Sequence, residues 1–543
     1  MTLTSSTHLD DLTGMTACLI VDGASIPRFA HAALELAVER GLKVTCVAVC
    51  DNTEVPRKPI KHGAYYLYKL LFLRGEWTRR VPWASLGTTD VAMHHFDSEW
   101  EGIWQRIPPE TLGFIGQHDV DVVLRFGMTL VRDPDDVPAA HGVVSFHHGD
   151  PAQYRGRPAG FYEVFDEADH LGIMVQRISN ELDAGNVLAY GAVRVVPHSY
   201  RESLENAYSA SSYLLVKALL NLRRNQCVDR STDGQNYRLP GNRLVLRFGL
   251  RLLRRKLRRM LYGLSIDKRW CLITTERVDL TDVQGETTLR MREEFPPPAG
   301  YSAIADPVVI DDRTLLCEGI EARTGRGRLL AATREGFWSV DTGAIGTGHL
   351  SYPHIVHVGD SRYVLPEMAQ IGPQSIAKLS SDRRELVNAV SLAGLTDLRL
   401  TDPTLLQHDG RWWLFAGQPG SAAELLFLWS AEDLKGPYVE HPDSPIVIDP
   451  SCARMAGPIQ LHEGRLFRVG QDNRRGYGDG VALSEILQLD QEHYREQYRG
   501  TLRMPDGHGP HSLDMRGQCG VADRYDEVRV ASAGLRRLRA RLP

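Results

Sequence analysis

The sequence predicts an α/β doubly wound domain and an all-β five-bladed propeller, joined by a helical connector. Three patterns indicate this fold class: strand and helix signals that alternate in the first half, an arginine-rich helical stripe, and a hairpin unit that recurs in the second half. The predicted boundaries are 1–220, 221–267 and 268–543. A chain of 543 residues has room for several domains, since one domain takes roughly 100–200 residues.

The first half reads as a parallel sheet. Residues 16–22 are a short apolar run typical of a strand that is buried on both faces. Residues 27–40 have helical apolar spacing, and residues 43–49 form the next strand signal. Further strands are predicted at 120–124, with an extension to 131, and at 142–147. We expect the site at the carboxyl ends of these strands.

The connector contains a strongly basic amphipathic stretch at 243–264. Its apolar residues advance by four and three, and it holds seven arginines, one lysine and no acid, against a formal net charge of −5 for the whole chain. One interpretation, which we favour, is a connector whose apolar stripe packs on a domain. The other is a helix that lies on an anionic membrane surface through Arg243–Arg259.

The second half repeats a hairpin unit that begins at a proline. Pro307, Pro353, Pro403 and Pro458 are 46, 50 and 55 residues apart, and each is followed by an apolar strand, a polar turn and a second strand. A repeat of this length is typical of propeller blades. With residues 270–275 closing the ring against the C-terminal segment, we expect five blades; two stacked β-sandwiches are the alternative.

Composition excludes several classes. With 43% hydrophobic and 24% charged residues the chain is globular, and its mild acidity argues against nucleic-acid binding. The eight cysteines form no C-x-x-C pair, and no metal site is predicted. Neither a secretory signal nor a long apolar span is evident, so we expect a cytoplasmic protein. This expectation includes a protein bound peripherally to the inner face of the membrane.

Three motifs follow one another between residues 119 and 188: V-D-V-V-L-R-F-G-M-T, S-F-H-H-G-D-P-A-Q-Y-R-G and E-L-D-A-G. This stretch resembles the catalytic core of the folate-dependent formyltransferases, which act on methionyl-tRNA, glycinamide ribonucleotide or nucleotide sugars. The resemblance implies N10-formyltetrahydrofolate as the formyl donor and His147 with Asp183 as the catalytic pair. It further implies donor contacts at Phe126, Gly127, Met128, Thr129 and Leu182, and substrate contacts at Tyr154, Arg155 and Gly156.

One position departs from that family. The family has Asn two residues before the His, where its amide donates to the formyl oxygen, and this chain has Ser145. A hydroxyl can donate one hydrogen bond but reaches less far, and losing an oxyanion donor costs about 10²–10³-fold in rate. Ser145 is therefore the third candidate catalytic residue, and it leaves open a re-tuned or inactive site.

The propeller carries a second resemblance. Asp306 and Asp402 look like the acids of five-bladed glycosidases that act on arabinan or fructan, but Ala456-Gly457-Pro458 stands where those enzymes have their acid Glu. Glu318 and Glu367 are further channel candidates. The segments H-D-G-R-W-W-L-F and Q-D-N-R-R-G-Y-G resemble the N-terminal propeller of glucosamine inositol phosphorylceramide transferases, a family that works on glycolipids. This implies that Asp306, Glu367 and Asp402 contact a glycan.

Three functions remain open. The first is a formyltransferase that acylates the amine of an amino sugar or glycoconjugate, with the propeller recognising the glycan. The second is a propeller-based glycosidase or glycosyl transferase using Asp306 and Asp402. The third is a non-catalytic glycan-binding protein. A methionyl-tRNA substrate is disfavoured, because no basic RNA-binding domain follows the catalytic core.

Overall fold

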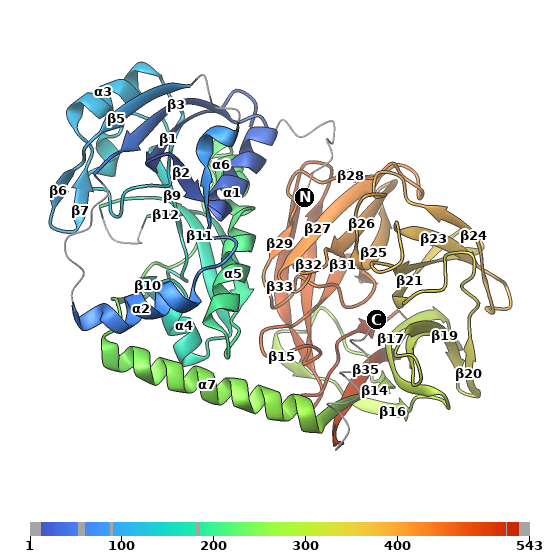
Figure 1. Ribbon diagram of the computed structural model, residues 1–543. Helices are drawn as coiled ribbons and strands as arrows, with labels where there is room; N and C mark the ends of the chain where they lie inside the picture. Colours follow the sequence, from blue (N-terminus) through green and yellow to red (C-terminus); the bar gives the residue numbers. More distant parts are fainter. Residues whose placement is uncertain (1–11, 53–59, 87–90, 181–184, 517–518, 531–543) are drawn as a thin grey trace. The chain divides into compact units, whose positions relative to one another are not determined.

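The chain forms two compact units, Met1–Leu257 and Arg258–Pro543, in a computed structural model that describes residues 12–52, 60–86, 91–180, 185–516 and 519–530. The boundary between the units lies within one long helix, α7 (Asn242–Ser265) (Figure 1). Among the described residues, no helix combines the length and the apolar character that crossing a bilayer requires.

Unit 1 is built on a seven-stranded sheet. Its strand order is β12 (Asn186–Arg194), β11 (His170–Arg177), β9 (Val143–His147), β8 (Val122–Arg125), β1 (Thr16–Asp22), β3 (Lys43–Cys50) and β5 (Ala92–Phe96). The five strands from β9 to β5 are parallel, whereas β11 runs antiparallel to both β9 and β12. The sheet is therefore mixed rather than parallel throughout. The connection from β9 to β11 holds the three-residue β10 (Tyr154–Gly156) and the six-residue α4 (Phe161–Asp166). It has no long crossover helix of the kind that joins parallel strands.

Helices cover both faces of this sheet. Cys18 and Ile20 of β1 pack with Ile115 of α3 (Pro109–Gln117) in one buried cluster. On the other side lie α1 (Arg28–Glu39), α5 (Tyr200–Ser211) and α6 (Leu214–Arg223), which contact one another, and α5 and α6 also contact β11 and β12 (Figure 1). Because successive residues of a strand point to opposite faces, an all-apolar run such as Thr16–Asp22 supplies both layers.

The predicted extension of the third strand, 120–124, to residue 131 is wrong. β8 ends at Arg125, whose guanidinium donates to the carbonyl oxygens of Met128 at 2.8 Å and Thr129 at 2.9 Å. Met128 has a positive φ of 59°, so the backbone turns away from the sheet at this point.

The connector also differs from its prediction. Residues 221–241 are not part of its helix: α6 ends at Arg223, and β13 (Gln235–Tyr237) pairs with β10 (Tyr154–Gly156) inside unit 1. The favoured interpretation, with the apolar stripe packed, is wrong as well. Val245 and Phe248 are the buried residues of α7, and the leucines of the stripe are exposed.

Unit 2 is a five-bladed propeller, as predicted. Four sheets comprise β17–β20 (301–339), β21–β24 (351–391), β25–β29 (401–448), and β30–β33 (460–503) joined by β15 (Gly285–Thr288). The fifth joins β14 (Ile266–Thr275) and β16 (Met291–Phe295) to β34 (Leu513–Asp514) and β35 (Gly520–Arg529). β14 and β35 pair antiparallel over their whole length, so the predicted closure of the ring is confirmed.

The prolines of the repeat mark a shared irregularity. The first strands of three blades have a register shift that spans Asp306, Tyr352 and Asp402, each the residue before a repeat proline. All three have positive φ, at 52°, 41° and 50°. Gly457 takes this position in the fourth blade with φ 142°. A bulge re-aims side chains out of the alternation of a strand, so the repeat prepares one special position in each of these blades.

Candidate active site

His147 and His148 at the end of β9 have different surroundings. His148 Nε2 lies 3.0 Å from Ser211 Oγ, and its ring packs between Phe29 and Tyr208. Burial and the neighbouring His147 lower the pKa of His148 to about 3, so it is a neutral core residue. His147 lines a cavity of about 550 Å³. The structure thus brings the predicted catalytic histidine, and not its neighbour, to the cavity.

Ser145 does not line this cavity. It is 4% exposed, and its hydroxyl accepts hydrogen bonds from Arg125 Nη2 at 2.7 Å and Nε at 3.1 Å. The guanidinium of Arg125 does line the cavity. The expected role of Ser145 as a direct donor is therefore replaced by a positioning role, in which Ser145 holds Arg125 at the end of β8.

Gln176 stands beside Ser145 on the adjacent strand. The two residues are paired in the β9–β11 register, so their side chains share one face of the sheet with His147. Gln176 is 4% exposed and lines the cavity, and its Oε1 has no hydrogen-bond partner in the described part of the chain. A buried amide oxygen without a partner is costly, so Gln176 is a candidate for contact with a ligand in the cavity. Sequence reasoning missed it, because the pairing of β9 with β11 was not known.

The loop expected to bind the pterin uses its own N–H groups internally. Phe126 and Gly127 donate to Ile20 O, Met128 donates to Asp22 Oδ1, and Thr129 donates to Gln105 Oε1. These four amides are not available to a ligand. Of the four residues, only Thr129 lines the cavity, so the predicted backbone contacts of Phe126, Gly127 and Met128 are corrected to a supporting role.

Two further predicted segments flank the cavity. In β10, Gly156 lines it with φ 89°, and a Cβ there would lie 2.1 Å from Tyr237 O. Tyr154 stacks on Tyr237 at 5.5 Å, and neither Tyr154 nor Arg155 is part of the cavity wall. Leu182 and Asp183 lie outside the described residues; Ile178 and Ser179, which precede them in the sequence, line the cavity.

An ion pair that was not predicted holds the loop after His147. Asp150 is 1% exposed and accepts from Arg230 Nε at 2.9 Å, and His170 Nε2 lies 3.3 Å away. Burial acts to raise the pKa of Asp150, but the hydrogen bonds from His170 and Arg230 hold it well below its ordinary value. Gly149 completes the turn: a Cβ there would lie 2.8 Å from His147 Nε2.

The wall of the cavity is basic. Among the residues that the structure describes, its lining includes three arginines and two histidines and no carboxylate. Such a wall favours an anionic ligand, because cationic side chains in a partly enclosed site attract negative charge. The lining residues are His62, Ile103, Trp104, Arg125, Thr129, Leu130, Val131, Phe146, His147, Gly156, Arg157, Gln176, Ile178, Ser179, Asn236, Tyr237, Arg238 and Leu239.

The propeller gathers a second set of charged residues where its blades meet. His511 lies between two carboxylates, with Nδ1 2.6 Å from Asp523 and Nε2 3.2 Å from Asp306. Burial acts to lower the pKa of His511, but the flanking acids raise it well above its ordinary value. Glu318 lies near Asp306, and burial together with that neighbour raises its pKa. Asp306 is therefore already engaged by a cation.

The other predicted acid is also paired. Arg454 Nε donates to Asp402 Oδ2 at 2.5 Å, and the Asp402 N–H donates to Glu367 Oε2 at 3.0 Å. Burial and Asp402 raise the pKa of Glu367 to about 8. The acid Glu of those glycosidases corresponds to Ala456, whose methyl group is buried in the core of the propeller, so no carboxylate is offered there. Two-carboxylate hydrolysis does not fit this arrangement.

The two quoted propeller motifs have different roles. In the first, Trp412 and Trp413 are buried, and Trp413 belongs to the core. In the second, Tyr477 is 41% exposed, with its ring 5.2 Å from the Arg454 guanidinium and 5.1 Å from the His511 ring. An exposed aromatic ring beside charged hydrogen-bonding groups suits a sugar, which offers one apolar face and several hydroxyls.

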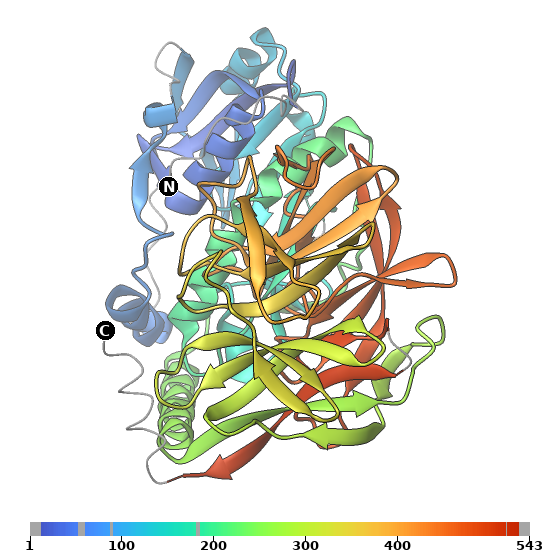
Figure 2. The same ribbon diagram turned by 90° about the vertical axis from the view of Figure 1, so that its right-hand side faces the viewer.

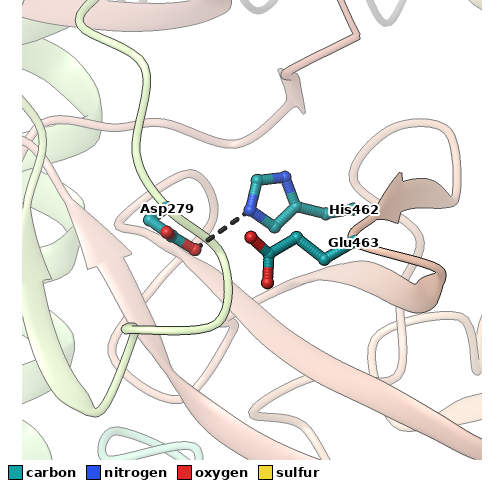
Figure 3. Close-up of side chains that lie close together, drawn as sticks. All are labelled: Asp279, His462 and Glu463. Atoms are coloured by element: carbon teal, nitrogen blue, oxygen red, sulfur yellow. Dashed lines mark hydrogen bonds and ion pairs between the residues drawn. The ribbon is translucent and has the colours of Figure 1, made fainter.

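A third cluster lies on the surface of the propeller. Asp279, His462 and Glu463 bring potential metal-ligand atoms within 4.8 Å of one another (Figure 3). Asp279 Oδ1 already accepts from the Thr281 N–H and hydroxyl, and it lies 3.0 Å from His462 Nε2. These contacts account for the cluster as a tie between a loop and the turn of a hairpin.

Comparison with known proteins bears on the propeller. Residues 338–504 match the family described as glucosamine inositolphosphorylceramide transferase 1, N-terminal. The propeller is similar to this domain. The predicted resemblance to that family is confirmed. The protein of this name from Oryza sativa subsp. japonica is 34% identical over 155 residues, and that from Arabidopsis thaliana is 30% identical over 158. In both cases the match covers 27% of this chain and 20% of the relative, so the chain spans about a fifth of those proteins.

Solved structures are similar to parts of the chain. A GH43 protein from Bacillus licheniformis matches with 19% identity and a TM-score of 0.28, over 40% of this chain and 45% of that chain. A glycinamide ribonucleotide transformylase 1 from Symbiobacterium toebii matches with 14% identity and a TM-score of 0.28, over 42% of this chain and 94% of that chain.

Proposed function

We propose that the protein transfers a formyl group from N10-formyltetrahydrofolate to the amine of an amino sugar in a glycoconjugate, and that the propeller binds the glycan. The observation that carries the proposal is the cavity at the end of β9, where His147, Arg125 and Gln176 meet a basic wall. The names of the relatives contain glucosamine, an amino sugar, joined to an anionic lipid. That name supports the choice of acceptor.

The residues present fit a formyl donor. The basic wall suits the carboxylates of a folate, and the cavity of about 550 Å³ lies in the size range of small-molecule sites. When bound, the donor supplies an activated formyl carbon. The amine forms a bond to this carbon, the bond from the carbon to the folate nitrogen breaks, and the proton lost by the amine is returned to that nitrogen.

Each step has a residue of this chain that suits it. His147 carries the proton between the two nitrogens, since an imidazole exchanges protons near neutral pH. Arg125 and the amide of Gln176 stabilise the negative charge on the formyl oxygen while both nitrogens are attached. Asp183, by resemblance, orients His147 or receives the proton. Gln176 thus does the work that the family assigns to the Asn replaced here by Ser145.

The test is a turnover assay with formyl-folate and a panel of amino sugars, glucosamine-containing glycolipids among them. We expect release of tetrahydrofolate with at least one amine and loss of about 10²–10⁴-fold in His147→Ala. His95→Ala, on the exposed end of β5, is the matched control and keeps full activity. Absence of turnover with every amine, or equal turnover in both variants, contradicts the proposal.

A second candidate is glycan binding by the propeller without catalysis. Tyr477 beside Arg454 and His511 favours it, because this cluster offers a sugar an aromatic face and charged donors. Binding of the same glycolipids that falls in Tyr477→Ala, with no tetrahydrofolate release from any amine, would select this candidate over formyl transfer.

A further inference from the structure

Two helices, α7 and a helix of unit 1 that contacts its first half, expose an unusual amount of apolar surface. The stripe of α7 runs from Leu246 to Leu264 and is solvent-facing along its length, with Leu250 68% exposed and Leu253 56% exposed. The complete set is Leu246, Leu250, Leu253, Leu257, Met260, Leu261 and Leu264, with exposed fractions from 47% to 68%. At about 100° per residue, these side chains fall within one arc of about 100° on the helix.

The stripe is not the face through which α7 packs on unit 1, because α7 packs there through another face. Phe248 is fully buried, with its ring 4.3 Å from Phe161. Arg255 donates to Val164 O, Phe165 O and Pro197 O. These contacts hold α7 in one rotation, and that rotation turns the leucine stripe outward.

The neighbouring helix α2 (Gly63–Phe72) exposes a second set of apolar residues. Asn242 at the start of α7 accepts from the Ala64 N–H at 2.9 Å and donates to Ile60 O at 3.1 Å. The ring of Tyr68 lies 5.9 Å from that of Phe248, so the two helices are joined (Figures 1 and 2). The exposed apolar residues here are Ile60, Leu67, Leu70, Leu71 and Phe72, with exposed fractions from 53% to 90%.

The charges beside this surface are of one sign. On α7, Arg247, Arg254 and Arg258 are exposed and lie on one flank of the stripe, and the helix has no acid. Lys61, Lys69 and Arg74 accompany α2, and the stretch 60–74 has no acid either. Leucines bordered by arginines match a bilayer whose headgroups are anionic, since the side chains enter the acyl boundary while the cations meet phosphate and carboxylate groups.

We propose that α2 and the stripe of α7 form a membrane-binding surface that lies in the interface of an anionic bilayer. This goes beyond formyl transfer and does not depend on it. A surface of this kind would hold the protein where a lipid-linked acceptor is found. Nucleic acid would use the arginines but not the leucines, and a second copy of the chain would use the leucines but not the arginines. Of these three occupants, only an anionic bilayer would contact both the leucines and the arginines.

The test is flotation of the full chain with vesicles of phosphatidylcholine containing about 30% phosphatidylserine, against vesicles of phosphatidylcholine alone. We expect binding to the anionic vesicles that weakens as NaCl is raised to about 0.5 M. Replacing Arg247, Arg254 and Arg258 by Gln should weaken it roughly 100-fold, at about fivefold per cation. Replacing Leu250, Leu253 and Leu257 by Gln should weaken it at least about tenfold, and Gln keeps the helix intact.

Matched controls lie on the propeller. Leu461→Gln removes a leucine that is 70% exposed, and Arg290→Gln removes an arginine that is 82% exposed; neither should change flotation. Absence of flotation, or flotation unaffected by both sets of helix substitutions, overturns the proposal. So does binding to an RNA oligonucleotide, or self-association in sedimentation, without binding to vesicles. Tetrahydrofolate release by the unbound protein reports separately on formyl transfer.

Discussion

His147 reaches the cavity because the turn that follows it has no side chain at Gly149. A Cβ at this position would lie 2.6 Å from the backbone oxygen of Tyr154 and 2.8 Å from Nε2 of His147. Asp150, next in the chain, is fixed by Arg230 and cannot yield. The position of the imidazole therefore depends on one missing methyl group.

Gly149→Ala should consequently displace His147. We expect formyl transfer to fall by about 10–100-fold, because small misplacements of a reacting group are costly, with a loss of stability of roughly 1–3 kcal/mol from overpacking. The measurements are tetrahydrofolate release and urea unfolding. Gly113→Ala is the control: no atom lies within 4 Å of its added Cβ in α3, and activity should be unchanged. Equal activity in the two variants would show that His147 is not catalytic.

Gln176→Met tests the amide at the cavity. Methionine keeps the length and volume of the side chain but cannot donate to an oxyanion, so kcat should fall by about 10²-fold with little change in KM. Stability should hold or rise, because an unpaired buried oxygen is removed. Gln374→Met, in the propeller, serves as the control, since Gln374 donates to Pro366 O and has no place in the cavity. A change in KM alone would indicate substrate binding instead.

At the scale of elements, the bulge before each repeat proline determines what each blade presents to its neighbours. Three blades carry a positive-φ residue with a side chain there, and the fourth carries Gly457. The carbonyl of Leu513 fills the space that a side chain would need. Glycine at this position is thus part of how the fourth and fifth blades pack.

Gly457→Ala should be severe. Its Cβ would lie 2.2 Å from Leu513 O at φ 142°, so we expect a loss of at least roughly 3 kcal/mol in the free energy of unfolding. Gly464→Ala is matched in backbone strain, with φ 74°, but no atom lies within 4 Å of its Cβ, and about 1–2 kcal/mol is expected. Urea unfolding followed by tryptophan fluorescence compares them. Similar losses would mean that the Leu513 contact is not the cause.

At the scale of the whole molecule, the paired charges make stability depend on pH. Glu367 has a pKa raised to about 8, so it holds its proton in the folded state across the range in which an unfolded glutamate has lost it. Protons bound only by the folded state stabilise it at low pH, and that stabilisation is lost as the pH rises from about 5 to 8. The pKa of His511 is also raised, so its contribution to stability likewise decreases as the pH rises above the ordinary pKa of histidine.

The contribution of Glu367 to the free energy of unfolding should therefore fall with rising pH, by on the order of 1 kcal/mol per pH unit between about pH 5 and 8. Glu367→Gln keeps an acceptor for the Asp402 N–H but cannot ionise, so its curve should be flatter. Urea unfolding at several pH values gives both curves. Two parallel curves would contradict the assignment, because the difference between the curves separates Glu367 from groups such as His148, whose lowered pKa acts in the opposite direction.

Much of the molecule was determined by local sequence. The all-apolar run at residues 16–22 specifies a strand covered on both sides, and the spacing of the prolines specifies blades, since each pattern follows from the period of its own element. His147 could be named from its motif, and the closure by residues 270–275 from the unpaired ends of the repeat.

Other features were decided only when distant segments met. Gln176 joins the site through its pairing with Ser145. The backbone N–H groups of Phe126, Gly127 and Met128 donate hydrogen bonds to β1, which lies about a hundred residues earlier in the chain. The direction of the α7 stripe depends on which face the aromatic residues around Phe161 bind. Sequence periodicity determines that a helix has an apolar face, but the buried contacts of its other faces decide whether that face meets protein or solvent.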